Sequence, residues 1–236
     1  MSVRLLLERA QRIYRTEGFK PLLRQGLRFV VQRFITCETY YVYRYDVSKV
    51  ADIDIDEITP GIEGFNERMV HSNREADELE LQGFEFRSST IYSRRALDKG
   101  AIAHCMSAGQ ELAAVGWIAM TEEARVALRE PPYKVDFAEG EACITAVWTN
   151  PKYRRMGLLY YGGVVRDRFL GDKGIKTRRS MVPKDNIPSV RGAAKYGTEL
   201  YAEVRYVRIL WWKSWKETPV SVVTEEGGGQ PDGDYS

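Results

Sequence analysis

The sequence predicts an α+β fold in which a central mixed sheet carries helices on both faces. The chain has 236 residues, of which 44% are hydrophobic and 29% are charged, an ordinary composition for one globular domain with appendages. Its apolar residues switch between the two-residue period of strands and the 3.6-residue period of helices. The resulting order is strand, helix, hairpin, strand, helix, strand, helix and strands, which suits one sheet between layers of helices.

The segment 39–47 is rich in β-branched and aromatic side chains and predicts a strand. A helix is expected over 62–81, and the segments 101–107 and 112–120 form a hairpin around the turn 108–110. The remaining predicted elements are a strand over 142–149, a helix over 158–170, a strand over 178–182, a helix over 188–196, and a strand pair or long strand over 200–215.

Residues 1–35 predict a basic amphipathic helical extension, broken near Gly18–Pro21. It holds eight Lys or Arg and two acidic residues. One apolar stripe follows helical spacing: Leu23, Leu27, Val30, Val31 and Phe34. Basic amphipathic helices lie at anionic membrane surfaces, so we expect that contact, or one with an acidic partner. Alternatively, the stripe packs on the main domain or on a second subunit. Nucleic acid is not expected, because the arginines have no accompanying stacking platform.

The main domain is expected over 36–217, and 218–236 reads as a disordered tail, because its glycines, proline and acidic residues cannot bury apolar surface. Three cysteines without CxxC spacing and two histidines indicate neither a disulfide framework nor a metal site. No apolar run approaches the length of a membrane span, and arginines interrupt the N-terminus where a signal peptide would be apolar. We therefore expect a cytoplasmic protein, peripheral to the inner face of the membrane if residues 1–35 bind lipid.

The segment 147–159 has the pattern of an anion site. A strand runs into a basic turn with Arg154 and Arg155, and Gly157 then opens a helix. The first turn of a helix offers unpaired N–H groups and the positive end of the helix dipole. Glycine lets a phosphate approach the backbone closely, and the arginines add charged donors. The alternative from this fragment alone is a solvated helix start.

This segment resembles motif A of the GNAT superfamily of N-acetyltransferases, Gln/Arg-x-x-Gly-x-Gly/Ala, which holds the pyrophosphate of coenzyme A. Arg154 matches the first position and Gly157 the central glycine, whereas Leu159 stands where the family prefers Gly or Ala. Downstream, Asn186, Ser189 and Gly197 match a second family pattern, in which the Asn contacts the pantetheine arm. That Asn could instead cap the helix that follows it.

The resemblance implies a GNAT-like fold with acetyl-CoA, or another acyl-CoA, as cosubstrate. The residues that it implies for cofactor binding are Val147, Thr149, Arg154, Arg155, Met156, Gly157, Leu158, Leu159, Asn186 and Ser189.

GNAT enzymes transfer the acyl group by direct attack of an amine, here of an unknown small molecule or peptide. A backbone N–H near Val147 or Trp148 would stabilise the oxyanion. The candidate base is Glu141, and the candidate acids are Tyr196, Tyr201 and Tyr160. The family's frequent tyrosine aligns with Ala193, so the alternative is an inactive GNAT-fold protein that binds an acyl-CoA or a partner.

Overall fold

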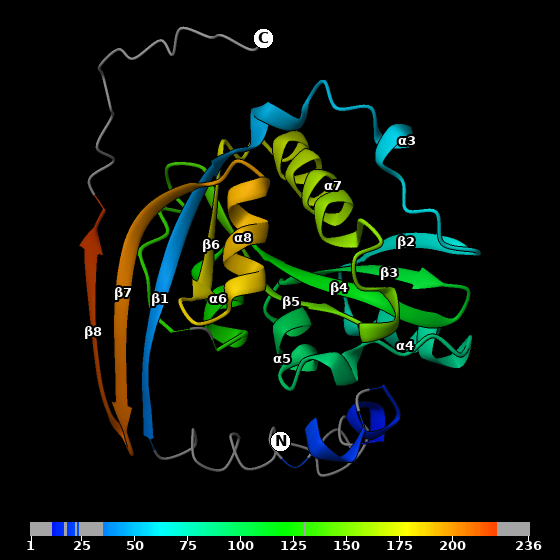
Figure 1. The fold of residues 1–236 in the computed structure, drawn as a ribbon, viewed down its shortest axis with the longest axis horizontal. Helices are drawn as coiled ribbons and strands as arrows, with labels where there is room; N and C mark the ends of the chain where they lie inside the picture. The colour runs from blue at the N-terminus through cyan, green and yellow to red at the C-terminus, as the bar shows by residue number, and fades with distance from the viewer. Residues whose placement is uncertain (1–10, 17, 22, 24–34, 130, 221–236) are drawn as a thin grey trace, which may run out of the picture.

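The computed structural model describes residues 11–220, except residues 17, 22, 24–34 and 130. Its centre is an eight-stranded mixed sheet with strand order β2-β3-β4-β5-β6-β1-β7-β8. The only parallel neighbours in this sheet are β5 and β6, and all other pairs are antiparallel. Helices lie on both faces (Figure 1). The predicted α+β class, a mixed sheet between layers of helices, is therefore confirmed.

The strands are β1 (Ile35–Asp46), β2 (Phe65–Val70), β3 (Ile102–Ala108), β4 (Glu111–Ala119), β5 (Glu141–Thr149), β6 (Thr177–Pro183), β7 (Glu199–Ile209) and β8 (Trp212–Pro219). The α-helices are α3 (Ile55–Ile58), α4 (Asn73–Leu81), α5 (Ser93–Asp98), α6 (Glu122–Ala127), α7 (Leu158–Asp172) and α8 (Ile187–Lys195). Short 3-10 helices are η1 (Val47–Val50), η2 (Arg87–Ser89) and η3 (Pro151–Tyr153).

The core has two layers, one on each face of the sheet. On one face, α4, α5 and α6 bury small residues such as Ala76, Ala96 and Ala124 against Trp117 of β4. On the other face, α7 buries Leu170 against the sheet. Burial of apolar surface at about 25 cal/mol per Å² drives both contacts. The α7 face also carries α8, which lies in front of β6 (Figure 1).

The strand β1 lies between β6 and β7 and pairs antiparallel with both. Its β-branched and aromatic residues alternate between the two faces, so that Val42 enters one core layer and Tyr45 enters the other. The first strand of the chain thus joins the last three strands into one half of the sheet.

The predicted helix over 62–81 is wrong in its first half. Residues 65–70 form the edge strand β2, because Met69 and Val70 bury on opposite faces when the segment pairs with β3. The helix α4 begins only at Asn73, where Ser72 Oγ accepts from the N–H of Glu75 at 3.2 Å. The carboxylate of Glu75 in turn accepts from the N–H of His71 at 2.8 Å. The sequence Ser-x-x-Glu is the capping-box signal for a helix start, although here the glutamate bonds the N–H one residue before the N-cap.

The helices α5 and α6 occupy stretches for which the sequence predicted no element. At the other end of the chain, β8 continues to Pro219, past the start expected for the tail, and the rest of the predicted tail, 221–236, lies outside the described residues. In the described part of the chain, no helix has the length and apolar character needed to span a bilayer.

The N-terminal extension is described only in part, and it contacts the main domain there. Residues 11–16 are helical. Arg12 forms an ion pair with Glu85, donates to the Glu85 carbonyl at 3.0 Å, and stacks over the ring of Trp148 at 5.8 Å. Most of the predicted apolar stripe, from Leu27 to Phe34, lies outside the described residues. The contact of Arg12 lies outside that stripe, so the membrane and packing interpretations of the stripe both stay predictions.

Candidate functional site

The strands β5 and β6 stop pairing halfway along their length. Their parallel register covers Glu141 to Ile144 against Thr177 to Ser180. Beyond Ile144, β5 stays with β4 and β6 stays with β1, so the two strands diverge (Figure 1). The backbone edge of β5 that faced β6 therefore has no strand beside it in the described sheet over residues 145–149. Unpaired edge groups of this kind are free to bind an extended ligand.

A β-bulge lies on β5 where the divergence begins. The register with β4 shifts across Gly116, so that Ala146 and Val147 together stand opposite one residue. Ala146 has a φ of 47°, the left-handed backbone that an alanine rarely adopts. Bulges redirect a strand and are frequent beside active sites. Here the bulge leaves Val147 42% exposed, while Trp148 packs back against the core.

The turn from η3 to α7 has the geometry of an anion site. Arg155 and Gly157 both have positive φ, 66° and 82°, and Met156 between them does not. Such alternation turns successive N–H groups toward one side. Gly157 is the N-cap of α7, and the first turn of this helix contains no acidic residue. The helix's free N–H groups and dipole therefore favour a bound anion.

The side chains around this turn separate into anchored and exposed ones. Leu158, the first residue of α7, is buried in the core, whereas Met156 is 40% exposed. Arg154 and Arg155 are exposed. Leu159 lies close to α8. A Cβ added at Gly192 would lie 3.0 Å from its Cδ2 atom. The leucine side chain is thus accommodated by a glycine on the neighbouring helix.

Glu111, at the start of β4, holds the approach to this turn. Its carboxylate accepts from Asn150 Nδ2 at 3.2 Å, from Lys152 Nζ at 2.7 Å and from the Tyr153 hydroxyl at 2.6 Å. The bonds from Lys152 and Tyr153, in that order, lower the pKa of Glu111. The carboxylate stays charged at neutral pH and keeps the turn in place before any ligand binds, which reduces the entropic cost of binding.

Asn186 caps α8, as one of the two sequence interpretations expected. Its Oδ1 atom accepts from the N–H of Ser189 at 3.4 Å, a long bond. Asn186 is exposed at the end of β6, and Ile187 beside it is 49% exposed. The amide Nδ2 atom is not used by the cap. The cap therefore does not occupy the amide donor of Asn186.

Glu141 lies at the opposite end of β5 from the bulge. Six residues at about 3.3 Å each place it roughly 20 Å from Val147. Its carboxylate accepts from Arg179 Nη2 at 2.7 Å and from Arg179 Nε at 3.0 Å, and it also accepts from the N–H of Asp136. Both partners of the ion pair are largely buried. The geometry gives Glu141 a structural role and disfavours it as the base.

Tyr196 lies behind α7, and its hydroxyl donates to Asp167 Oδ2 at 2.7 Å. Burial raises the pKa of Tyr196, and the charge of Asp167 raises it further. Tyr201 lies under the guanidinium of Arg179, whose Cζ atom is 3.9 Å from the ring centroid. Tyr160, in the first turn of α7, is 40% exposed, and its ring meets that of Tyr196. Of the three tyrosines, Tyr160 is the one nearest to the anion turn in sequence and exposed there.

A buried polar chain crosses the sheet beneath α7. Arg166 Nη1 lies 3.3 Å from His104 Nδ1, and His104 Nε2 lies 3.0 Å from Glu67 Oε2. A Cβ added at Gly116 would lie 2.7 Å from Arg166 Nη1, so this glycine makes room for the guanidinium directly opposite the bulge. Burial lowers the pKa of Arg166 to about 10, and the group keeps its charge at neutral pH. No sequence pattern marks these residues as a connected set.

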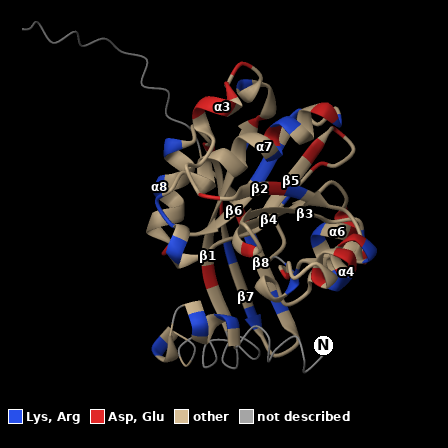
Figure 2. Cartoon of the chain, turned by 90° about the vertical axis from the view of Figure 1, so that its right-hand side faces the viewer, with Lys and Arg blue, Asp and Glu red and all other residues tan. Residues whose placement is uncertain are grey.

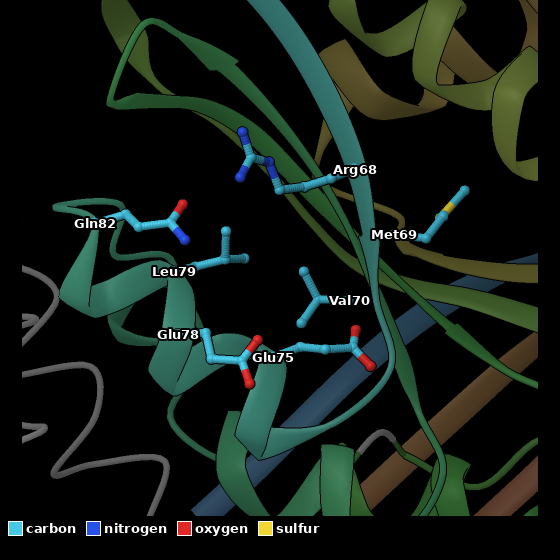
Figure 3. A pocket seen from close by; sticks show the side chains of 7 residues that line it. All are labelled: Arg68, Met69, Val70, Glu75, Glu78, Leu79 and Gln82. Carbon is cyan, nitrogen blue, oxygen red and sulfur yellow. The ribbon is translucent and has the colours of Figure 1, made fainter.

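A shallow pocket between β2 and α4 is a weaker candidate site (Figure 3). It lies at the edge of the sheet, with Arg68 and Leu79 facing it and two glutamates, Glu75 and Glu78, at its rim. Glu75 already serves the α4 cap. Within the described residues, no group of three metal-binding side chains comes together. The anion turn and the diverging strands remain the best-formed site.

No family model matches the chain, and no curated protein matches it. Among solved structures, the chain is similar to a GCN5-related N-acetyltransferase-like protein from Streptococcus suis, at 14% identity and a TM-score of 0.48, over 83% of this chain and 67% of that one. A GCN5-related N-acetyltransferase from Kribbella flavida matches at 14% identity and a TM-score of 0.42, over 78% of this chain and 63% of that one.

A Drosophila protein is also similar, at 12% identity and a TM-score of 0.46, over 79% of this chain and 56% of that one. This chain spans about three fifths of the length of the Drosophila and Kribbella proteins. The likeness to GNAT structures concerns the fold alone. Identities and scores this low give no evidence about the activity, substrate or partner of this chain.

Proposed function

We propose that the protein is an N-acyltransferase that moves an acetyl or related acyl group from an acyl-CoA to an amine. One observation carries the proposal. The helix α7 begins at a left-handed glycine with exposed arginines beside it, directly after a strand that has diverged from its parallel neighbour. The unpaired strand edge is thus followed directly by a phosphate site. This arrangement suits a long ligand that has a phosphate group and an amide-containing arm.

The turn from Arg154 to Leu159 would hold the pyrophosphate through its N–H groups and the two arginine side chains. Val147 and Thr149 would contact the pantetheine arm through the open edge of β5. Asn186 and Ser189, at the start of α8, would line the opposite side. This assignment uses every cofactor-binding residue that the sequence predicted. It requires no buried charged side chain to move.

In the reaction, the amine attacks the thioester carbonyl and the carbon–sulfur bond breaks. The proton leaves the amine and a proton reaches the thiolate, so the charges balance without a covalent enzyme intermediate. A backbone N–H of the bulge, at Val147 or Trp148, would stabilise the oxyanion. Tyr160 is our preferred acid, because Tyr196 is engaged by Asp167 and Tyr201 by Arg179. We expect the reaction in the cytoplasm.

Two measurements on the full-length protein test the proposal. Isothermal titration calorimetry with acetyl-CoA measures binding, and a thiol-reactive dye measures coenzyme A release with a panel of amines. We expect micromolar binding, with thiol release that depends on the amine. A protein that binds neither acetyl-CoA nor longer acyl-CoAs would contradict the proposal.

A second candidate function is binding of an acyl-CoA or of a partner without chemistry. The observation in its favour is that Glu141 and Tyr196, the candidate base and acid of the sequence analysis, are held in largely buried contacts with Arg179 and Asp167. Calorimetry that shows binding, together with no thiol release from any amine tested, would favour this function over the first.

A further inference from the structure

The hairpin of β7 and β8 ends in an exposed apolar tip. Ile209 and Trp212 form its last pair, so Leu210 and Trp211 alone make the turn. Trp211 is 86% exposed, and Trp212 and Leu210 are about half exposed. Trp215, on β8, is a further exposed ring. Single exposed apolar residues need no explanation, but contiguous ones on one projecting element mark an interaction site.

The residues of this turn differ from those that two-residue hairpin turns usually contain. Two-residue hairpin turns favour Asn-Gly or similar pairs, because their central residues need positive φ. Leu210 has a φ of 54°, which costs a residue with a large side chain about 1–2 kcal/mol. Neither folding nor solubility is served by Leu-Trp here. Strain of this kind points to a use for the side chains.

The strands behind the tip place like charges opposite each other. Arg208 pairs with Lys213, and Arg205 pairs with Lys216. Like charges directly opposite destabilise a sheet. Residues 204–216 contain no acidic residue. On the hairpin itself, the flanking Glu203 pairs with Lys184 and Glu217 accepts from the N–H of Lys134, and on the neighbouring strand β1 Glu38 stands opposite Tyr206.

The strands β1, β7 and β8 extend together beyond the end of β6. Pro183, the last paired residue of β6, stands opposite Tyr40, whereas β1 and β7 remain paired from Tyr40 back to Ile35. Five residues at about 3.3 Å correspond to roughly 16 Å of projection. Figure 1 shows the tip at one end of the molecule, and Figure 2 shows Lys and Arg on this part of β7.

We propose that the tip of the β7–β8 hairpin inserts into the headgroup region of an anionic lipid bilayer. Trp rings favour the membrane interface, and lipid phosphates would attract the basic residues of the hairpin. The two faces of the ribbon support insertion of the tip, because Trp212 and Trp215 point to opposite faces and each face also carries a lysine. This inference does not rest on the proposed transferase activity.

A second copy of the chain fits the same surface less well. A protein partner usually covers one face, but here the apolar and basic residues surround the tip. Lys213 and Lys216 also lie on the edge strand β8, where lysines oppose pairing with another strand. The bilayer is therefore the occupant that matches both the shape and the charge of the hairpin.

Co-sedimentation of the full-length protein with vesicles tests the proposal. The vesicles contain phosphatidylcholine alone, or an equal mixture of phosphatidylcholine and phosphatidylglycerol. We expect binding only to the mixed vesicles, a blue shift of tryptophan fluorescence, and weakening by salt. W211S/W212S should abolish the blue shift and lower partitioning at least about tenfold. K213E/K216E should lower partitioning by a similar factor, most strongly at low salt.

Two double variants serve as matched controls. L81S/V126S removes exposed apolar residues elsewhere, and K173E/K176E makes the same charge change beside the start of β6, at the far end of the sheet. Both should bind like the wild type. Wild-type protein that binds neither vesicle would overturn the proposal, as would normal partitioning of W211S/W212S. Light scattering that shows a dimer lost in W211S/W212S, without vesicle binding, would instead identify a second copy as the occupant.

Discussion

The substitution of Gly157 by valine tests whether this turn binds an anion, because the loss of ligand affinity can be compared with the loss of stability that backbone strain causes. A Cβ at Gly157 would meet no atom within 4 Å, so the change displaces nothing in the protein itself. Its cost to folding comes from the φ of 82°, about 1–2 kcal/mol for an ordinary residue and more for a β-branched one. At roughly 2–4 °C per kcal/mol, the melting temperature should fall by several degrees.

The effect on ligand binding should be larger than that strain explains. The added side chain occupies the space through which a phosphate would approach the N–H groups of α7. We expect the affinity for acetyl-CoA, measured by calorimetry, to fall at least about tenfold, which is 1.4 kcal/mol. Gly174→Val is the matched control, because Gly174 follows the other end of α7 with a φ of 78° and equally open surroundings. Equal acetyl-CoA affinity in the two folded variants would refute the anion site.

Three further substitutions test individual contacts. Asn186→Ser keeps a capping oxygen but loses the amide donor, so we expect normal thermal stability and weaker acetyl-CoA binding; unchanged binding would leave the cap as the only role. Glu141→Gln breaks a largely buried ion pair and should cost about 3 kcal/mol in urea unfolding, whereas a catalytic base would show normal stability and lost turnover. Burial lowers the pKa of His104, so the folded protein takes up its proton less readily than the unfolded chain, and stability should fall as the pH drops below about 6.5, by at most about 1.4 kcal/mol per pH unit. His104→Gln should flatten that slope between pH 7 and pH 5, and an unchanged slope would assign it to other groups.

The elements around the site were predictable because their signals are local. The segment 142–149 matches β5, and 158–170 matches most of α7, since both have strong apolar patterns. The position of Gly157 was also predictable, because a glycine between a basic turn and a helix is typical of an anion site. The left-handed φ of Arg155 had none, because arginine shows no preference for that conformation.

The contacts that make the site rigid could not be predicted, because they join distant segments. The Glu111 carboxylate bonds the Tyr153 hydroxyl although Glu111 lies about forty residues earlier in the chain. Arg166 lies beside His104 in a space that Gly116 leaves open. Nothing in the spacing of these residues distinguishes them from surface charges. The strand β2 was missed for a different reason, since its apolar residues merged with those of α4 into one apparent helical pattern.

The position of β1 has a consequence for how the protein reaches its folded state. This strand is translated before every other strand of the sheet, yet both of its neighbours lie well over a hundred residues further along the chain. Such non-local pairing requires costly loop closure and slows folding. The half of the sheet that contains β1 must therefore assemble late, after β6 and β7 have left the ribosome.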